Sequence, residues 1–142
     1  MELAVVSIDG RQVTPHGALE DLSDRLAARH CAEAVSIELN SREAHFIAKR
    51  LGIVACTVPK IDFGSLIRGR AGKNVTVLSD AGSVRELVAD VLDVPESALP
   101  LPQALSLTVI RASRSGVRSV LCLNDTMHLT IGDRTPAAVE GV

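Results

Sequence analysis

Short apolar runs of strand length alternate with segments of helical periodicity along most of this chain of 142 residues. The first run covers residues 3–8, and residues 17–30 then carry apolar side chains at the i, i+3, i+4 spacing of an amphipathic helix. Parallel strands need crossover connections of this kind, so the sequence predicts an α/β fold with a mainly parallel sheet and helices on both faces. The same unit recurs twice, with strands predicted over residues 34–39 and 75–78 and helices over residues 41–51 and 83–92.

The end of the chain departs from this alternation. After a proline-rich loop, two strand-like runs over residues 105–110 and 119–123 flank a turn at residues 113–116, which is the pattern of a β-hairpin. We therefore expect a C-terminal antiparallel hairpin in the sheet, within a single three-layer domain over residues 1–129. The small and polar residues 130–142 are expected to form a disordered tail.

Local signals mark the second predicted helix. Asn40 or Ser41 is available to cap its start, and Gly52 is expected to end it. Residues 53–58 then predict a short extended piece, and residues 64–74 a loop.

Composition excludes several classes of function. Hydrophobic residues make up 46% of the chain but aromatic residues only 1%, which argues against nucleic-acid modules that stack bases on aromatic rings. The formal net charge of −2 also argues against a nucleic-acid partner. No apolar run approaches the roughly 20 residues that span a bilayer, and no signal sequence is recognised, so we expect a cytoplasmic protein without a membrane partner. Scattered cysteines without CxxC spacing (Cys31, Cys56 and Cys122) favour reduced thiols over disulfides or zinc.

Two of the predicted strands end at an aspartate close to a glycine. LAVVSIDG ends at Asp9 and Gly10, and NVTVLSDAG has Asp80 two residues before Gly82. In open α/β sheets, ligands bind outside the carboxyl ends of the strands. Asp9 and Asp80 are therefore candidates for one shared site.

Five segments carry a family resemblance. LSLTVIRASRSGVRSVLCLNDTMHL resembles the carboxyl-terminal hairpin of the histidine phosphatase (phosphoglycerate mutase-like) superfamily, whose chains often finish in a phrase like NDxxHL. Four earlier segments look like other family segments in a consistent order: VTPHG, AVSIELNSREA, KIDFG and VLSDAGSVRELV. The resemblance implies a histidine-phosphatase-like fold over most of the chain.

The residues that carry the family's chemistry are replaced. The family transfers a phosphoryl group through a histidine in an Arg-His-Gly triplet, which here corresponds to Ile8-Asp9-Gly10. By the same resemblance, Asp80 stands at the second histidine position and Lys60 at the position of the acidic proton donor. Arg42 is the candidate for the remaining phosphate-binding arginine. The family's helical insertion over the active site is also missing, mostly between residues 64 and 74.

These replacements reverse the electrostatics of the implied site. Two carboxylates repel an approaching phosphate where the family offers cations, so we expect no phosphoryl transfer through histidine. None of the four histidines aligns with a catalytic position, and each is expected to be solvated or structural: His16, His30, His45 and His128.

A pair of close carboxylates can instead support acid–base catalysis. Both cannot ionise cheaply, so one pKa rises and the pair can hold a proton near neutral pH. An acid and a base in the same place suit isomerisation, cyclisation, dehydration or ring opening of a neutral or cationic small molecule. The hypothesis assigns catalysis to Asp9 and Asp80, and substrate contacts to Ser7, Arg42, Lys60 and Ser79.

The alternative is a catalytically dead pseudophosphatase that acts as a ligand-binding, regulatory or partner subunit. In that case Asp80 caps the helix that follows it, bonding Ser83, and Asp9 is an ordinary turn residue. Neither hypothesis needs a cofactor, and two carboxylates without a third ligand do not predict a metal site. Apolar surface left by the missing insertion predicts a homodimer.

Two groups of basic residues remain. Arg68, Arg70 and Lys73 are candidates to bind an anion, although a solvated loop is the preferred interpretation. A second group flanks the predicted hairpin turn and is expected to face solvent: Arg111, Arg114 and Arg118.

Overall fold

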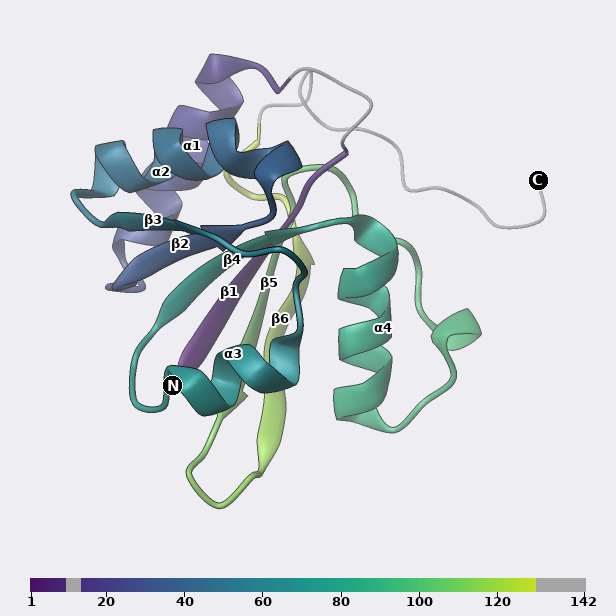
Figure 1. Ribbon diagram of the computed structural model, residues 1–142. Coiled ribbons are helices and arrows are strands. Elements are labelled where there is room, and N and C mark those ends of the chain that lie inside the picture. The colour runs from purple at the N-terminus through teal and green to yellow at the C-terminus, as the bar shows by residue number, and fades with distance from the viewer. Residues whose placement is uncertain (10–13, 130–142) are drawn as a thin grey trace.

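The computed structural model describes residues 1–9 and 14–129 of the chain. Its elements follow one another as β1 (Glu2–Ser7), α1 (His16–Ala27), β2 (Glu33–Ser36), η1 (Glu38–Asn40), α2 (Ser41–Leu51), β3 (Val54–Thr57), α3 (Phe63–Gly69), β4 (Val75–Ser79), α4 (Ala81–Leu92), η2 (Glu96–Ala98), β5 (Leu107–Ala112) and β6 (Arg118–Asp125). The strands form one sheet in the order β3-β2-β4-β1-β5-β6 (Figure 1).

The sheet is mixed, as the sequence predicts. Strands β3, β2, β4 and β1 pair in parallel, whereas β5 is antiparallel to both β1 and β6. The last two strands are the expected C-terminal hairpin. The fold is therefore a mixed α/β single domain, in agreement with the prediction.

Helices cover both faces of the sheet, with α1 and α2 on one face and α3 and α4 on the other (Figure 1). Strand β1 explains why both faces are apolar. Successive side chains of a strand point to opposite faces, and here Ala4 and Val6 pack with α1 and α2 while Leu3 and Val5 pack with α3 and α4. A strand buried on both faces is nearly continuously apolar, which is why residues 3–8 are apolar at every position except Ser7.

The order of the strands creates a switch point between β1 and β4. These two strands are neighbours in parallel register, with Ser7 opposite Ser79. Helix α1, which follows β1, and helix α4, which follows β4, lie on opposite faces. The two connections diverge at the carboxyl ends of the strands, and in open α/β sheets this is where ligands bind.

Three local expectations are corrected. The predicted strand over residues 34–39 ends at Ser36, and the chain turns into the 3₁₀ helix η1. Asn40 occupies the cap position of α2 without a capping side-chain bond, although Gly52 ends that helix at φ 68° as predicted. Within the predicted loop over residues 64–74, helix α3 forms because the Asp62 side chain accepts a hydrogen bond from the Ser65 N–H.

Two expectations concern residues that the structure does not describe. They are the predicted tail over residues 130–142 and the glycine beside Asp9, Gly10. The three cysteines are free thiols, as predicted. Among the helices that the structure describes, none has both the length and the apolar character required of a membrane span.

Candidate functional site

A pocket of about 380 Å³ opens at the carboxyl ends of the parallel strands, beside the switch point. Its walls come from the ends of β1, β2 and β4, from the loop after β3 and from the first turn of α4. Most of the lining is aliphatic: Ile8, Ile37, Leu39, Pro59, Ile61 and Leu78. Five polar residues interrupt it: Asn40, Lys60, Ser79, Asp80 and Ser83.

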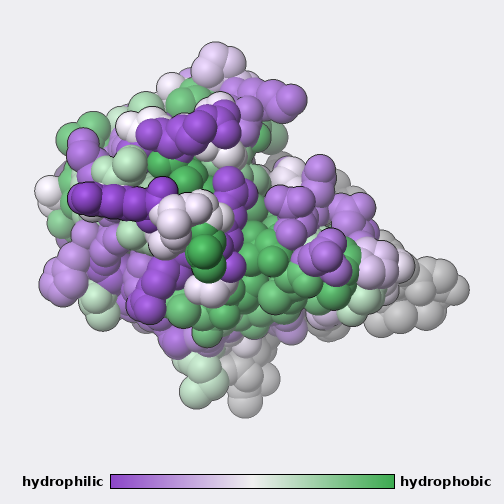
Figure 2. All heavy atoms as spheres, turned by 90° about the horizontal axis from the view of Figure 1, so that it is seen from below, coloured by the Kyte–Doolittle hydropathy of each residue, from purple (hydrophilic) through white to green (hydrophobic). Residues whose placement is uncertain are grey.

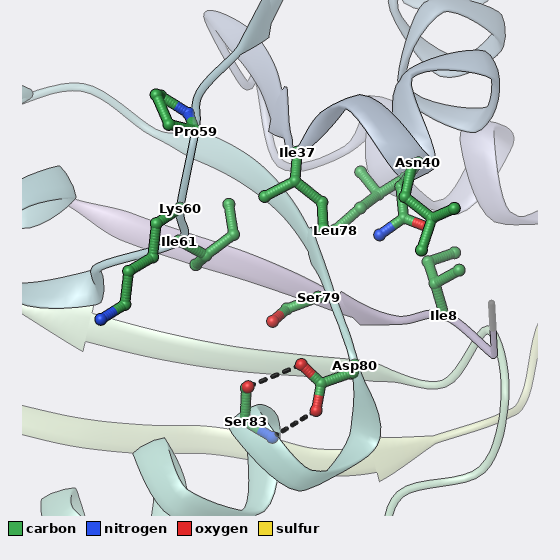
Figure 3. A pocket seen from close by; sticks show the side chains of 11 residues that line it. Ile8, Ile37, Asn40, Pro59, Lys60, Ile61, Leu78, Ser79, Asp80 and Ser83 are labelled. Carbon is green, nitrogen blue, oxygen red and sulfur yellow. Dashed lines mark hydrogen bonds between the residues drawn. The ribbon is translucent and has the colours of Figure 1, made fainter.

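Asp80 is the carboxylate of this pocket, and the backbone holds it in place. It follows β4 directly and occupies the cap position of α4. Its two oxygens accept hydrogen bonds from the Ser83 N–H at 2.9 Å and the Ser83 hydroxyl at 2.6 Å (Figure 3). The capping role that the alternative hypothesis gives Asp80 is confirmed.

These bonds keep Asp80 ionised. Burial acts to raise the pKa of the Asp80 carboxyl, but the hydrogen bonds from Ser83 outweigh it, and the pKa lies below its ordinary value. Asp80 is therefore a fixed negative charge at neutral pH and not a proton donor.

Asp9 lies at the neighbouring strand end. Ser7 pairs with Ser79 in register, and the Ile8 N–H donates to the Ser79 carbonyl at 2.8 Å, so Asp9 and Asp80 follow adjacent, bonded strand ends. Asp9 is half-buried and has contacts of its own. It is not among the residues that line the pocket, whereas Asp80 is. The predicted proximity of the two strand ends is present, and only one of the two aspartates contributes to the pocket wall.

Of the four residues predicted to contact a substrate, two line the pocket and two do not. Lys60 and Ser79 line the pocket, and Lys60 extends from the loop after β3 (Figure 3). Ser7 does not line it: Ser7 is only 1% exposed, and its carbonyl accepts from the Leu105 N–H at 2.6 Å. Arg42 does not line it either. Its guanidinium lies on the exposed start of α2, 3.3 Å from His16 Nε2.

Asn40 and Ser83 line the pocket without having been assigned to a site. Asn40 is 6% exposed and comes four residues after β2, near the end of a third parallel strand. The signal that singled out Asp9 and Asp80, a polar residue just beyond a buried strand, also applies to Asn40. Ser83 is recognisable as the helix residue that a capping Asp80 would bond.

No histidine or arginine lines this pocket within the described residues. His16 packs edge-on against Phe46, with ring centroids 5.3 Å apart, and the His45 Nδ1 lies 2.6 Å from the Ser41 carbonyl. His128 Nε2 lies 2.7 Å from the Leu105 carbonyl. Burial lowers the pKa of His128, which favours the neutral ring in that position. Residues 1–9 and 14–129 also contain no cluster of three or more His, Cys, Asp or Glu side chains suited to a metal ion.

Comparison with known proteins gives a fold. No protein-family model and no curated protein sequence matches the chain. Solved structures do match. YhfR of Bacillus stearothermophilus has a TM-score of 0.73 at 13% identity, covering 89% of this chain and 98% of that one. A phosphoserine phosphatase mutant from Entamoeba histolytica has a TM-score of 0.67 at 10% identity, covering 91% and 98%. Phosphoglycerate mutase from Plasmodium falciparum has a TM-score of 0.60 at 12% identity, covering 92% and 94%. The chain has the fold of the histidine phosphatases and phosphoglycerate mutase-like proteins.

Proposed function

We propose that this chain binds a small molecule with an amino group and an apolar body in the strand-end pocket, and that it does not transfer phosphoryl groups. One observation carries the proposal. The pocket wall carries the carboxylate of Asp80, and among the described residues Lys60 is the one cationic side chain that lines the pocket, with no arginine or histidine.

The charges of the pocket are unsuited to phosphate. Enzymes that transfer phosphoryl groups surround the anionic oxygens with cationic groups and N–H donors. Among the described residues, this pocket offers one ammonium group, from Lys60, and opposes it with the carboxylate of Asp80. At about 4 Å and an effective dielectric constant of about 20, two like unit charges repel by roughly 4 kcal/mol. A phosphate beside Asp80 is therefore disfavoured.

The carboxylate of Asp80 suits an amine. Each carboxylate oxygen of Asp80 accepts one hydrogen bond from Ser83 and has a further lone pair to offer an ammonium group. The aliphatic lining, including Ile37, Ile61 and Leu78, favours an apolar body attached to that group. The pocket volume of about 380 Å³ lies within the range of small-molecule sites.

Titration with 3-methylbutylamine, followed by the methyl NMR signals of Ile37, Ile61 and Leu78, tests this proposal. We expect the amine to shift these signals and 3-methylbutanol, which has no charge, to shift them at higher concentration only. Asp80→Asn keeps a capping side chain but removes the charge, and it should weaken amine binding about tenfold. The wild-type protein should release no nitrophenol from p-nitrophenyl phosphate.

Asp62→Asn is the matched control. Asp62 caps α3 through the same two bonds, from the N–H and hydroxyl of Ser65, and lies outside the pocket. This variant should bind the amine as the wild type does. The proposal is wrong if the amine leaves the pocket signals unmoved, or if Asp80→Asn binds it with unchanged affinity.

Acid–base catalysis by Asp9 and Asp80 is the second candidate function, and the register of β1 and β4 favours it. Ser7 opposite Ser79 places the two aspartates after adjacent strand ends. The hydrogen bonds from Ser83 keep the pKa of Asp80 low, so in this mechanism Asp9 holds the proton and acts as the acid.

Carboxyl NMR titration distinguishes this second candidate from simple binding. Catalysis by the pair requires the pKa of Asp9 to be raised above its ordinary value in the wild type and to fall back in Asp80→Asn. An Asp9 pKa that is not raised, or that is the same in both proteins, excludes the pair as an acid–base unit while leaving the amine proposal intact.

A further inference from the structure

A second cleft of about 390 Å³ lies at the opposite end of the sheet, where the parallel strands begin. It is bounded by the end of α3, the turn that follows, the first residue of the chain and the turn between β5 and β6. Figure 2 looks onto this end of the molecule, where hydrophobic and strongly hydrophilic side chains meet. The cleft is therefore separate from the strand-end pocket.

Every charged side chain that lines this cleft is an arginine. Arg68 comes from α3, whereas Arg114 and Arg118 come from the hairpin, more than 40 residues later in the chain. The sequence predicts two separate basic groups that face solvent. The fold brings one arginine of the first group and two of the second to the same cleft, because the end of α3 and the hairpin turn both border it. No acidic residue lines the cleft within the described part of the chain.

Arg114 and Arg118 also lack the ion pairs that other arginines have. Arg25, Arg29, Arg50, Arg70 and Arg111 each pair with a carboxylate. Across residues 1–9 and 14–129, neither Arg114 nor Arg118 forms a salt bridge. Their guanidinium groups are available to an anion from solution.

The turn that carries these two arginines is held by its own hydrogen bonds. The Ser113 N–H donates to the Val117 carbonyl at 2.8 Å, and the Ser113 hydroxyl accepts from the Val117 N–H at 3.1 Å. Gly116 supplies the φ of 89° that closes the turn. A rigid turn reduces the conformational entropy that binding would otherwise cost.

The floor of the cleft is apolar. Met1 and Ile67 are partly buried against the core on the α3 and α4 side, and Ala71 and Ala112 also line the cleft. Arginine forms bidentate hydrogen bonds with phosphate, and an apolar floor favours an attached hydrocarbon group. A bare inorganic ion would use only part of this surface.

We propose that this cleft binds a small organic phosphate, with the phosphate group on Arg114 and Arg118 and the apolar group over Met1 and Ile67. The ligand is held and not converted, because no nucleophilic or acidic side chain other than Ser113 lines the cleft within the described residues. This proposal does not depend on the amine site at the other end of the sheet.

Isothermal titration calorimetry with phenyl phosphate tests it, with inorganic phosphate as the comparison. We expect phenyl phosphate to bind more tightly than inorganic phosphate. Arg114→Gln and Arg118→Gln should each weaken binding of phenyl phosphate about tenfold, which corresponds to about 1.4 kcal/mol, and the double variant should abolish it.

One variant serves as the control. Arg50→Gln removes the same charged group from α2, away from the cleft. It should bind phenyl phosphate with wild-type affinity. The proposal is overturned if the wild type does not bind phenyl phosphate, or if the double variant retains the affinity. A failure of 3-methylbutylamine to bind would not affect this result, because that probe reports on the other pocket.

Discussion

At the scale of single residues, Asp80 has a structural role that can be measured without a ligand. Its carboxylate caps α4, and loss of such a cap costs about 0.5–2 kcal/mol of unfolding free energy. We expect Asp80→Ala to lower the free energy of unfolding by that amount at neutral pH. Asp80→Asn should cost little there, because asparagine is also a good cap.

The pH dependence of that stability has a definite sign. The folded pKa of Asp80 lies below its ordinary value of about 3.9, so its contribution is present above that pH and is lost as the pH falls through the folded value. The free energy of unfolding, measured in urea, should therefore fall more steeply with decreasing pH in the wild type than in Asp80→Asn across the acidic range. The same pH dependence in both proteins would show that the pKa of Asp80 is not lowered by folding. Asp62, whose pKa is lowered by the bonds from Ser65, retains part of the dependence in the variant.

Individual site residues were predictable where strand order alone places them. Asp80 and Ser79 lie at the end of β4, and a polar residue at the end of a buried strand borders the crevice in any fold of this kind. Arg42 was not predictable, because its position on α2 does not determine where a long, exposed side chain extends. Its guanidinium lies beside His16 and outside the pocket.

At the scale of elements, two helices end in the same left-handed conformation with different residues. Gly52 ends α2 at φ 68°, and Asp93 ends α4 at φ 54°. Glycine adopts this conformation freely, whereas a side chain makes it unfavourable by about 1 kcal/mol. We expect Gly52→Ala to lower the free energy of unfolding by about 1 kcal/mol and Asp93→Gly to raise it. Thermal unfolding of both variants measures this, and opposite signs are required.

The elements that the sequence predicted are those with long apolar patterns. Helix α3 was missed because it has only seven residues, with glycine at its second and last positions, and a single buried side chain, Leu66. Its start signal, Asp62 three residues before Ser65, was present in the sequence. The predicted strand over residues 34–39 was too long because Ile37 and Leu39 are apolar, but they line the pocket instead of continuing the sheet.

At the scale of the whole molecule, the two proposed sites occupy opposite ends of one sheet. The pocket at the carboxyl ends contains Asp80, and the cleft at the other end is lined by three arginines. The strand order predicted the first location. The second depends on the fold placing the end of α3 and the hairpin turn around one cleft, which no local pattern in the sequence specifies.

The sheet also joins two hydrophobic clusters that lie on its opposite faces. Leu22 of α1 is fully buried in one cluster, and Leu87 of α4, 5% exposed, is buried in the other. Alternate residues of β1 belong to each cluster, so neither face can unfold without exposing the other.

Leu22→Ala and Leu87→Ala should each lower the free energy of unfolding by about 2–5 kcal/mol, and Leu39→Ala, at a residue that is 71% exposed, by far less. In urea, both core variants should retain one cooperative transition with the slope of the wild type, as expected for a single domain of this size. A second transition in either variant would mean that the two faces unfold separately and that β1 does not couple them.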